Sequence, residues 1–130
     1  MCIRDSGYIE AKVDKLKGAD IIFDGITVTG TENLMMAATL ADGVTTLQNV
    51  AKEPEIKDLA EMLNKMGAKI YDSGKEKIII DGVEKLHGCT HKVIPDRIEA
   101  GTFLIAAAAT SSSITISQVI QNHLETVLNK

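Results

Sequence analysis

His87, Cys89 and His91 form the first group of side chains that could do chemistry, because imidazole and thiolate groups are common ligands of zinc. Single residues separate the three, and this spacing matches no usual zinc pattern. Nothing nearby supplies a fourth ligand, so the sequence predicts no metal site. It also contains no glycine-rich nucleotide fingerprint and no Walker loop, and we expect no cofactor.

Two polar turns that lead into helices rich in small residues are the other candidates. They are DGITVTGTENLMMAAT at residues 24–39 and DRIEAGTFLIAAAAT at residues 96–110. Aligning their Gly-Thr pairs also aligns the Ala-Ala-Thr at 37–39 with the Ala-Ala-Thr at 108–110. The sequence therefore repeats at an interval of roughly seventy residues, and a second structural unit begins before the sequence ends.

Both turns have the spacing of a capping box, in which a side-chain oxygen accepts a hydrogen bond from an amide of the first helical turn. The pairs are Thr29 with Glu32, and Asp96 with Glu99. A helix cap explains Asp96 as well as a direct contact with a ligand does. For Arg97, an ion pair at the surface or between domains is the simpler interpretation.

The elements around these turns follow from periodicity and turn residues. The first unit is expected to run strand, helix, strand, helix and two hairpin strands, with its helices sharing one face of a mixed sheet. Expected strands cover residues 8–13, 19–23, 44–50, 69–71 and 77–80, and expected helices cover 29–41 and 53–66, before Gly67. The second unit is expected to have strands at 91–94 and 114–120, a helix at 102–110 and another from His123.

Composition excludes several classes of partner. A net charge of -4 with 3% aromatic residues offers neither a basic face nor a stacking platform for nucleic acid. The longest apolar stretch, at residues 103–109, is too short to cross a bilayer, so no membrane partner is expected. Two cysteines without a disulfide framework favour a reducing compartment, and we expect a cytoplasmic protein.

The organisation of the chain is expected to be that of an internal fragment. Residues 1–6, MCIRDS, share no pattern with the rest of the chain and are interpreted as a non-native leader. Residues 7–94 are expected to belong to a first domain, and residues 95–130 to begin a unit of a second domain that is cut short. The remainder of its own chain is therefore an expected partner, and the isolated piece is expected to be incompletely ordered.

Several ordered blocks of the sequence resemble the enolpyruvyl transferases that act on UDP-N-acetylglucosamine. The blocks are GADIIFDGITVTGTENLMMAATLADG, AKEPEIKDLAEMLNKMGAKI, IIIDGVEKLHG and PDRIEAGTFL, and the resemblance covers residues 7–130. It implies an α+β fold of repeated βαβαββ units, the inside-out α/β barrel architecture, with one near-complete unit here and the start of the next. It also implies an active site between two domains.

The resemblance further implies a reaction and its site residues. The reaction is transfer of enolpyruvyl from phosphoenolpyruvate to the sugar 3-hydroxyl, the first committed step of peptidoglycan precursor synthesis. The segment Gly25, Ile26, Thr27 and Val28 matches the family's contact with the sugar nucleotide, and a loop before a helix N-terminus suits an anionic ligand. Asp96 and Arg97 match the crossing between domains and are cleft candidates.

No catalytic residue is predicted within this sequence. The family's general acid is a cysteine in a loop that precedes the block matching Gly7, and neither Cys2 nor Cys89 has a matching context. The piece by itself is therefore expected to be inactive. Two alternatives stay open: a non-catalytic interaction module that reuses the repeat, and a transferase for another hydroxyl acceptor.

Overall fold

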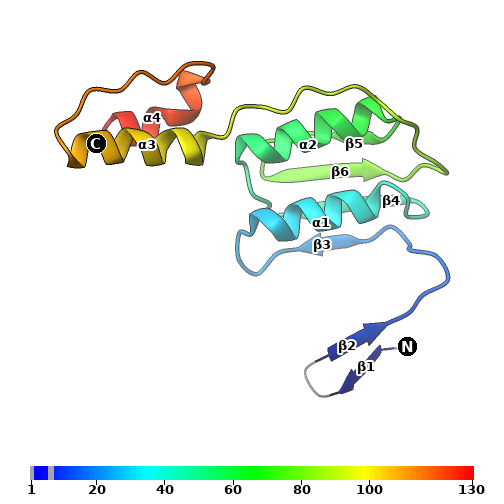
Figure 1. The fold of residues 1–130 in the computed structure, drawn as a ribbon. Helices are drawn as coiled ribbons and strands as arrows, with labels where there is room; N and C mark the ends of the chain where they lie inside the picture. The colour runs from blue at the N-terminus through cyan, green and yellow to red at the C-terminus, as the bar shows by residue number, and fades with distance from the viewer. Residues whose placement is uncertain (1, 6–7) are drawn as a thin grey trace. The chain divides into compact units, whose positions relative to one another are not determined.

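The computed structural model describes residues 2–5 and 8–130, which fall into two compact units that meet between His91 and Lys92 (Figure 1). Each unit is described by itself. The first contains β1 (Cys2–Asp5), β2 (Tyr8–Ala11), β3 (Asp20–Ile22), α1 (Val28–Ala38), β4 (Val44–Gln48), α2 (Pro54–Lys65), β5 (Lys69–Tyr71) and β6 (Lys77–Asp81). The second contains α3 (Arg97–Ala109), the 3-10 helix η1 (Gln121–Leu124) and α4 (Glu125–Leu128).

A mixed sheet organises the first unit, as the sequence predicted, and its strand order is β3-β4-β6-β5. Strand β3 pairs with β4 in parallel, and the other pairs are antiparallel. A parallel pair needs a crossover connection, and α1 supplies it between β3 and β4. The register places Leu47 beside Ile21 and Ile78, so these three side chains share one face of the sheet.

Both long helices of this unit cover that face, which confirms the expected α+β arrangement (Figure 1). The core between helices and sheet is apolar, and its fully buried side chains include Met35, Leu47, Ile56, Ile78 and Ile80. The opposite face of the sheet is open, with Val44 55% exposed and Tyr71 52% exposed. Burial alternates along β6, as expected for a sheet covered on one face, whereas in β4 the consecutive residues Thr45, Thr46 and Leu47 are all buried.

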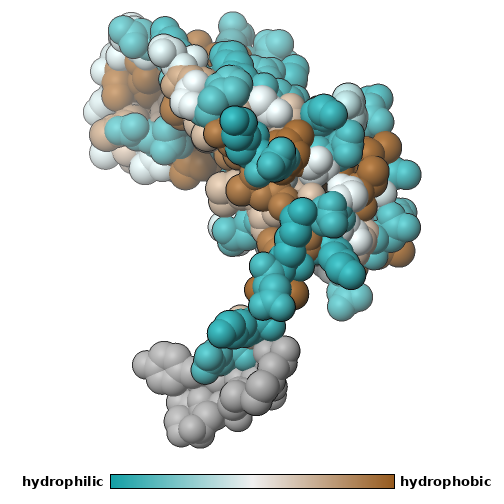
Figure 2. Space-filling view, turned by 90° about the vertical axis from the view of Figure 1, so that its right-hand side faces the viewer, coloured by the Kyte–Doolittle hydropathy of each residue, from teal (hydrophilic) through white to brown (hydrophobic). Residues whose placement is uncertain are grey.

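Helix α1 has apolar side chains on the side that faces away from the sheet as well. Met35 is completely buried, whereas Met36 is 43% exposed, and Leu40, in the turn just after the helix, is 48% exposed. Figure 2 shows apolar surface, in brown, between hydrophilic regions on one face of the molecule. Within the described residues, α1 contacts both α2 and strands β4 and β6, and the side that carries Met36 stays exposed.

The predicted start of α1 is wrong by two residues. Thr27, rather than Thr29, is the N-cap: its backbone is extended at φ -140° and ψ 125°, and its hydroxyl accepts a hydrogen bond from the Gly30 amide at 3.2 Å. A Cβ on residue 30 would lie 2.4 Å from the Thr27 methyl carbon. Glycine at position 30 therefore allows the capping side chain to lie against the first turn.

The second helix and the hairpin after it are confirmed. Helix α2 begins at Pro54, and Gly67 ends it with a left-handed φ of 98°. The turn between β5 and β6 places Asp72 at φ 60° and Gly74 at φ 85°, conformations that these residue types tolerate.

The segment from His87 to His91 runs along α2, and this explains the alternation of His87, Cys89 and His91. The His87 amide bonds the Met66 carbonyl at 2.9 Å, the Cys89 thiol lies 3.8 Å from the Met62 carbonyl, and His91 Nε2 lies 3.0 Å from Asp58 Oδ1. Two residues of an extended chain span about 6.6 Å, and four residues of a helix span about 6 Å. Every second residue of the segment therefore lies beside a successive turn of α2.

This alternation is therefore packing against a helix. The predicted strand at 91–94 is wrong, because His91 is bonded to α2 and the following residues pair with no strand. Within residues 2–5 and 8–130, no three His, Cys, Asp or Glu side chains are placed to hold a metal ion.

Strands β1 and β2 form a separate two-stranded sheet. The backbone of Cys2–Asp5, which falls within the expected leader, pairs antiparallel with β2. The predicted strand at 8–13 is shorter than expected and ends at Ala11. Met1, Ser6 and Gly7 lie outside the described residues.

The second unit is helical: the helix predicted at 102–110 is present with an earlier start, and the strand predicted at 114–120 is wrong. Helix α3 begins at Arg97 rather than at residue 102, because the Asp96 carboxylate caps the amides of Ile98 and Glu99 at 2.8 and 3.1 Å. Residues 114–120 form no strand, since the described part of this unit offers no strand to pair with them. The last expected helix appears as η1 followed by α4.

Candidate functional site

One edge of the sheet gathers the loops that could receive a ligand. Strands β3 and β4 are parallel, and β6 is antiparallel to both β4 and β5, so β3, β4 and β5 all end at this edge. The loops at 23–27 and 49–53 and the turn at 72–76 lie there. The N-termini of α1 and α2 follow the first two loops. The sequence-predicted residues Gly25, Ile26, Thr27 and Val28 are on this edge.

The N-terminus of α1 is open and carries no acidic residue in its first turn. The Gly30 amide donates to the Thr27 hydroxyl, and the first backbone hydrogen bond of the helix runs from the Thr31 amide to the Thr27 carbonyl. The amides of Val28 and Thr29 come before Thr31 and therefore have no acceptor within the helix. Ile26 is 65% exposed, and a Cβ placed on residue 25 would have no neighbouring atom within 4 Å. These amides and the positive end of the helix dipole make the loop suited to an anionic group.

Two side chains that the sequence analysis missed hold this loop in place. The Asn49 amide donates to the Phe23 carbonyl at 2.8 Å, where the loop begins. The Thr31 hydroxyl donates to the Thr27 carbonyl at 2.7 Å and accepts from the Ala51 amide at 3.2 Å, where the loop ends. The available signal was weak: Asn between a strand and a helix is a residue type that tolerates left-handed backbone.

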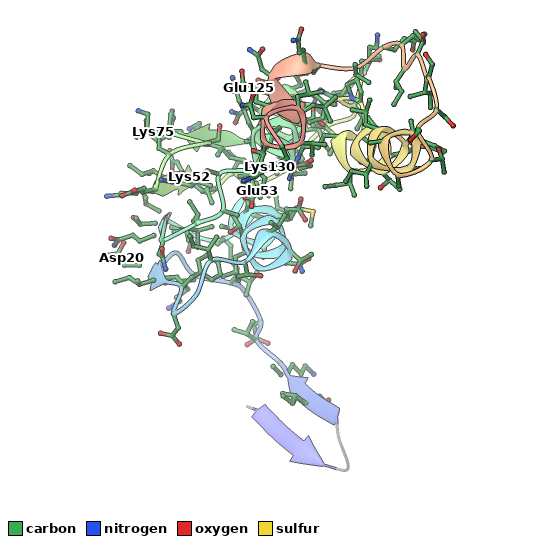
Figure 3. All side chains as sticks on the ribbon, turned by 90° about the vertical axis from the view of Figure 1, so that its left-hand side faces the viewer. Asp20, Lys52, Glu53, Lys75, Glu125 and Lys130 are labelled. Atoms are coloured by element: carbon green, nitrogen blue, oxygen red, sulfur yellow. The ribbon has the colours of Figure 1, made fainter. Side chains whose placement is uncertain are left out.

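Charged side chains at this edge pair with one another. The Lys52 ammonium lies 2.9 Å from Glu76 Oε1, and this hydrogen bond, together with the charge of Lys52, lowers the pKa of the Glu76 carboxyl. Lys75 pairs with Asp72 in the hairpin turn. Figure 3 shows Lys52 and Lys75 among the side chains of the first unit. Both pairs are exposed, so neither contributes much to stability.

The cleft candidates Asp96 and Arg97 are neighbours at the start of α3, in the second unit. The Asp96 carboxylate serves as the N-cap, and Arg97 is half-buried. A shallow pocket of 370 Å³ lies beside Asp96 and is also lined by Glu99, Phe103 and Gln118. Gly25 to Val28 belong to the first unit, so each set of predicted residues is placed within its own unit.

The described cysteine side chain does not belong to the loop edge. Cys89 is exposed and lies on the segment after β6 that runs along α2, with its thiol directed to the Met62 carbonyl. Cys2 is described by its backbone pairing in β1 only. No helix among residues 2–5 and 8–130 has the length and hydrophobicity needed to cross a membrane.

Comparison of the sequence with known proteins identifies close relatives. The chain is 70% identical to UDP-N-acetylglucosamine 1-carboxyvinyltransferase of Prochlorococcus marinus subsp. pastoris, over 98% of this chain and 29% of that relative. The enzyme of the same name from Hydrogenovibrio crunogenus is 59% identical, over 97% of this chain and 30% of its own length. The chain thus spans less than a third of these curated relatives.

A solved structure agrees in fold. The crystal structure of the enolpyruvyl transferase NikO from Streptomyces tendae matches with a TM-score of 0.70 at 24% identity, over 82% of this chain and 28% of that one. The family model described as EPSP synthase (3-phosphoshikimate 1-carboxyvinyltransferase) matches residues 2–130. This match extends over nearly the whole sequence, and the chain therefore belongs to the family of carboxyvinyl (enolpyruvyl) transferases that the model describes.

Proposed function

We propose that these residues are part of an enzyme that transfers enolpyruvyl from phosphoenolpyruvate to the 3-hydroxyl of UDP-N-acetylglucosamine, in peptidoglycan precursor synthesis. The observation that carries the proposal is the high identity, 59% to 73%, to relatives named for this sugar nucleotide. The family description names a different acceptor, 3-phosphoshikimate, which makes a transferase for that acceptor the second candidate.

The loop before α1 is the proposed binding segment for the sugar nucleotide. Gly25 and Ile26 are exposed, and Thr27 and Val28 are half-buried at the N-terminus of α1. A diphosphate is doubly anionic and gains from free amides and from the dipole, while a carboxylate in the first turn would repel it. The first turn of α1 has these amides and carries no acidic residue, and the one carboxylate of the loop is that of Asp24, at its start.

The chemistry that the proposal requires is an addition followed by an elimination. The sugar oxygen bonds to C2 of phosphoenolpyruvate while C3 gains a proton, and the hydroxyl proton leaves to a base. Phosphate then leaves from C2 and a proton leaves from C3, which restores the alkene. The steps need a general acid at carbon, and none of the described side chains is assigned this role. We expect the 130-residue polypeptide alone to show no turnover.

An assay of the natural protein that carries this sequence tests the proposal. Phosphate release from phosphoenolpyruvate should depend on added UDP-N-acetylglucosamine and should not occur with 3-phosphoshikimate as the acceptor. The reverse dependence would favour the second candidate. If phosphate is released with neither acceptor, or equally with both, acceptor-specific transfer is contradicted.

Asp96 and Arg97 are proposed to line the cleft, and two substitutions of Asp96 separate that role from helix capping. Asparagine also caps helices well, so Asp96→Asn should leave stability nearly unchanged. Asp96→Ala should lose about 0.5–2 kcal/mol of unfolding free energy. If the carboxylate faces the substrates, Asp96→Asn lowers kcat/KM at least as much as Asp96→Ala. Full activity in Asp96→Asn would show that Asp96 serves only as a helix cap and does not contact the substrates.

A further inference from the structure

We infer that Asn49 and Thr31 are positioning residues that hold the loop at residues 24–27 in the conformation that receives the ligand. The inference rests on the proposed function, because it concerns the loop that is proposed to bind the sugar nucleotide. Neither residue is assigned a contact with the ligand. Both act through the backbone at the two ends of the loop.

Asn49 fixes the beginning of the loop. It follows β4 and has a left-handed backbone, with φ 56°, which asparagine adopts more readily than most residues. This conformation directs the side-chain amide to the Phe23 carbonyl at 2.8 Å. The Phe23 amide in turn bonds the Gln48 carbonyl at 3.1 Å. The amide and the carbonyl of Phe23 are thus both hydrogen-bonded, to Gln48 and Asn49 respectively, at the end of β4.

Thr31 fixes the end of the loop. Its side chain is completely buried, so its hydroxyl must find partners inside the protein. It donates to the Thr27 carbonyl and accepts from the Ala51 amide. Removing the hydroxyl would leave the buried Ala51 amide without its partner, and the last residue of the loop would lose its link to the segment after β4.

The two bridges converge on the same short segment, Asn49 to Ala51. The loop of residues 24–27 therefore has both ends tied to one piece of backbone that follows the central strand β4. Ordering a backbone residue costs about 1–2 kcal/mol, and a loop that is already ordered avoids this cost when the ligand binds. The expected function of the bridges is to raise the affinity for the sugar nucleotide without taking part in the chemical steps.

Substitutions in the natural protein test this inference. Asn49→Gly keeps the left-handed backbone and removes the amide, and Asn49→Asp keeps the shape but places an oxygen against the Phe23 carbonyl. Thr31→Val keeps the shape and removes the hydroxyl, whereas Thr31→Ser restores it. We expect the KM for UDP-N-acetylglucosamine to rise about 3–10-fold in Asn49→Gly, Asn49→Asp and Thr31→Val. The KM for phosphoenolpyruvate and kcat should change little, and Thr31→Ser should recover most of the loss.

Asn64→Ala is the matched control. The Asn64 side chain makes two hydrogen bonds with the backbone of Ile70 in β5, the outer strand on the other side of the sheet from β3. Its removal should lower the Tm and leave the KM for the sugar nucleotide unchanged. If the wild type is active and Asn49→Gly folds with an unchanged KM for UDP-N-acetylglucosamine, this inference is overturned while the proposed function stands. Wild-type protein without turnover that depends on UDP-N-acetylglucosamine would overturn the proposed function, and this inference with it.

Discussion

Replacing Gly82 with alanine is expected to destabilise the first unit by about 3 kcal/mol or more, at the upper end of the range for overpacking. A Cβ at residue 82 would lie 1.7 Å from the Ala41 carbonyl oxygen and 3.1 Å from the Gly43 carbonyl oxygen. The Gly82 amide bonds that same Gly43 carbonyl at 3.0 Å, so the two backbones cannot separate without losing a hydrogen bond. Urea unfolding of the natural protein measures the effect.

Gly88→Ala is the control for this prediction. Nothing lies within 4 Å of a Cβ at residue 88, and its φ is not in the left-handed region. Its unfolding free energy should match that of the wild type to within about 0.5 kcal/mol. Equal stabilities for the two alanine variants would show that the backbone of residues 41–43 does not lie against Gly82.

Leu47→Ala is expected to cost about 2–5 kcal/mol of unfolding free energy, the usual cost of a cavity in a packed core. Leu47 is completely buried on β4, which lies between β3 and β6, and its neighbours across the sheet are Ile21 and Ile78. Because these neighbours are fixed by strand pairing, the site can collapse only partly around the smaller side chain. Urea unfolding again supplies the measurement.

Val44→Ala provides the comparison on the same strand. Val44 points to the open face of the sheet and is 55% exposed. Its truncation should cost less than about 1 kcal/mol, mainly through β propensity. If Val44→Ala destabilises the protein as much as Leu47→Ala does, the assignment of the buried face of the sheet is wrong.

Local signals explain which elements could be predicted from the sequence. Pro54, Gly67 and the turn at 72–74 fix backbone conformation over a few residues, and the helix and hairpin they delimit are confirmed. The strands predicted at 91–94 and 114–120 are wrong, because a strand exists only when a distant segment pairs with it. His91 shows a second cause of error: an alternating pattern also arises where an extended chain lies on a helix.

The candidate site also combines features that a local sequence pattern predicts with features that depend on distant residues. A turn before an apolar helix is visible in the sequence, and the resemblance to a family implies that Gly25 to Val28 contact the ligand. The two bridges that hold the turn span 26 and 20 residues of sequence, from Asn49 to Phe23 and from Ala51 to Thr31. No local pattern encodes such distant partners, so their roles required the structure. The start of α1 was displaced for a related reason, since Thr29 and Thr27 are equally good capping residues by type.

Hydrogen exchange in the natural protein, with and without saturating UDP-N-acetylglucosamine, tests the central claim most directly. If the loop before α1 binds the sugar nucleotide, peptides that contain the amides of Gly25 to Thr29 should exchange more slowly when the ligand is present. Peptides from α2 around Glu61, which is exposed away from the loop edge, should exchange as before. Bound ligand with unchanged exchange at residues 25–29 would contradict the account.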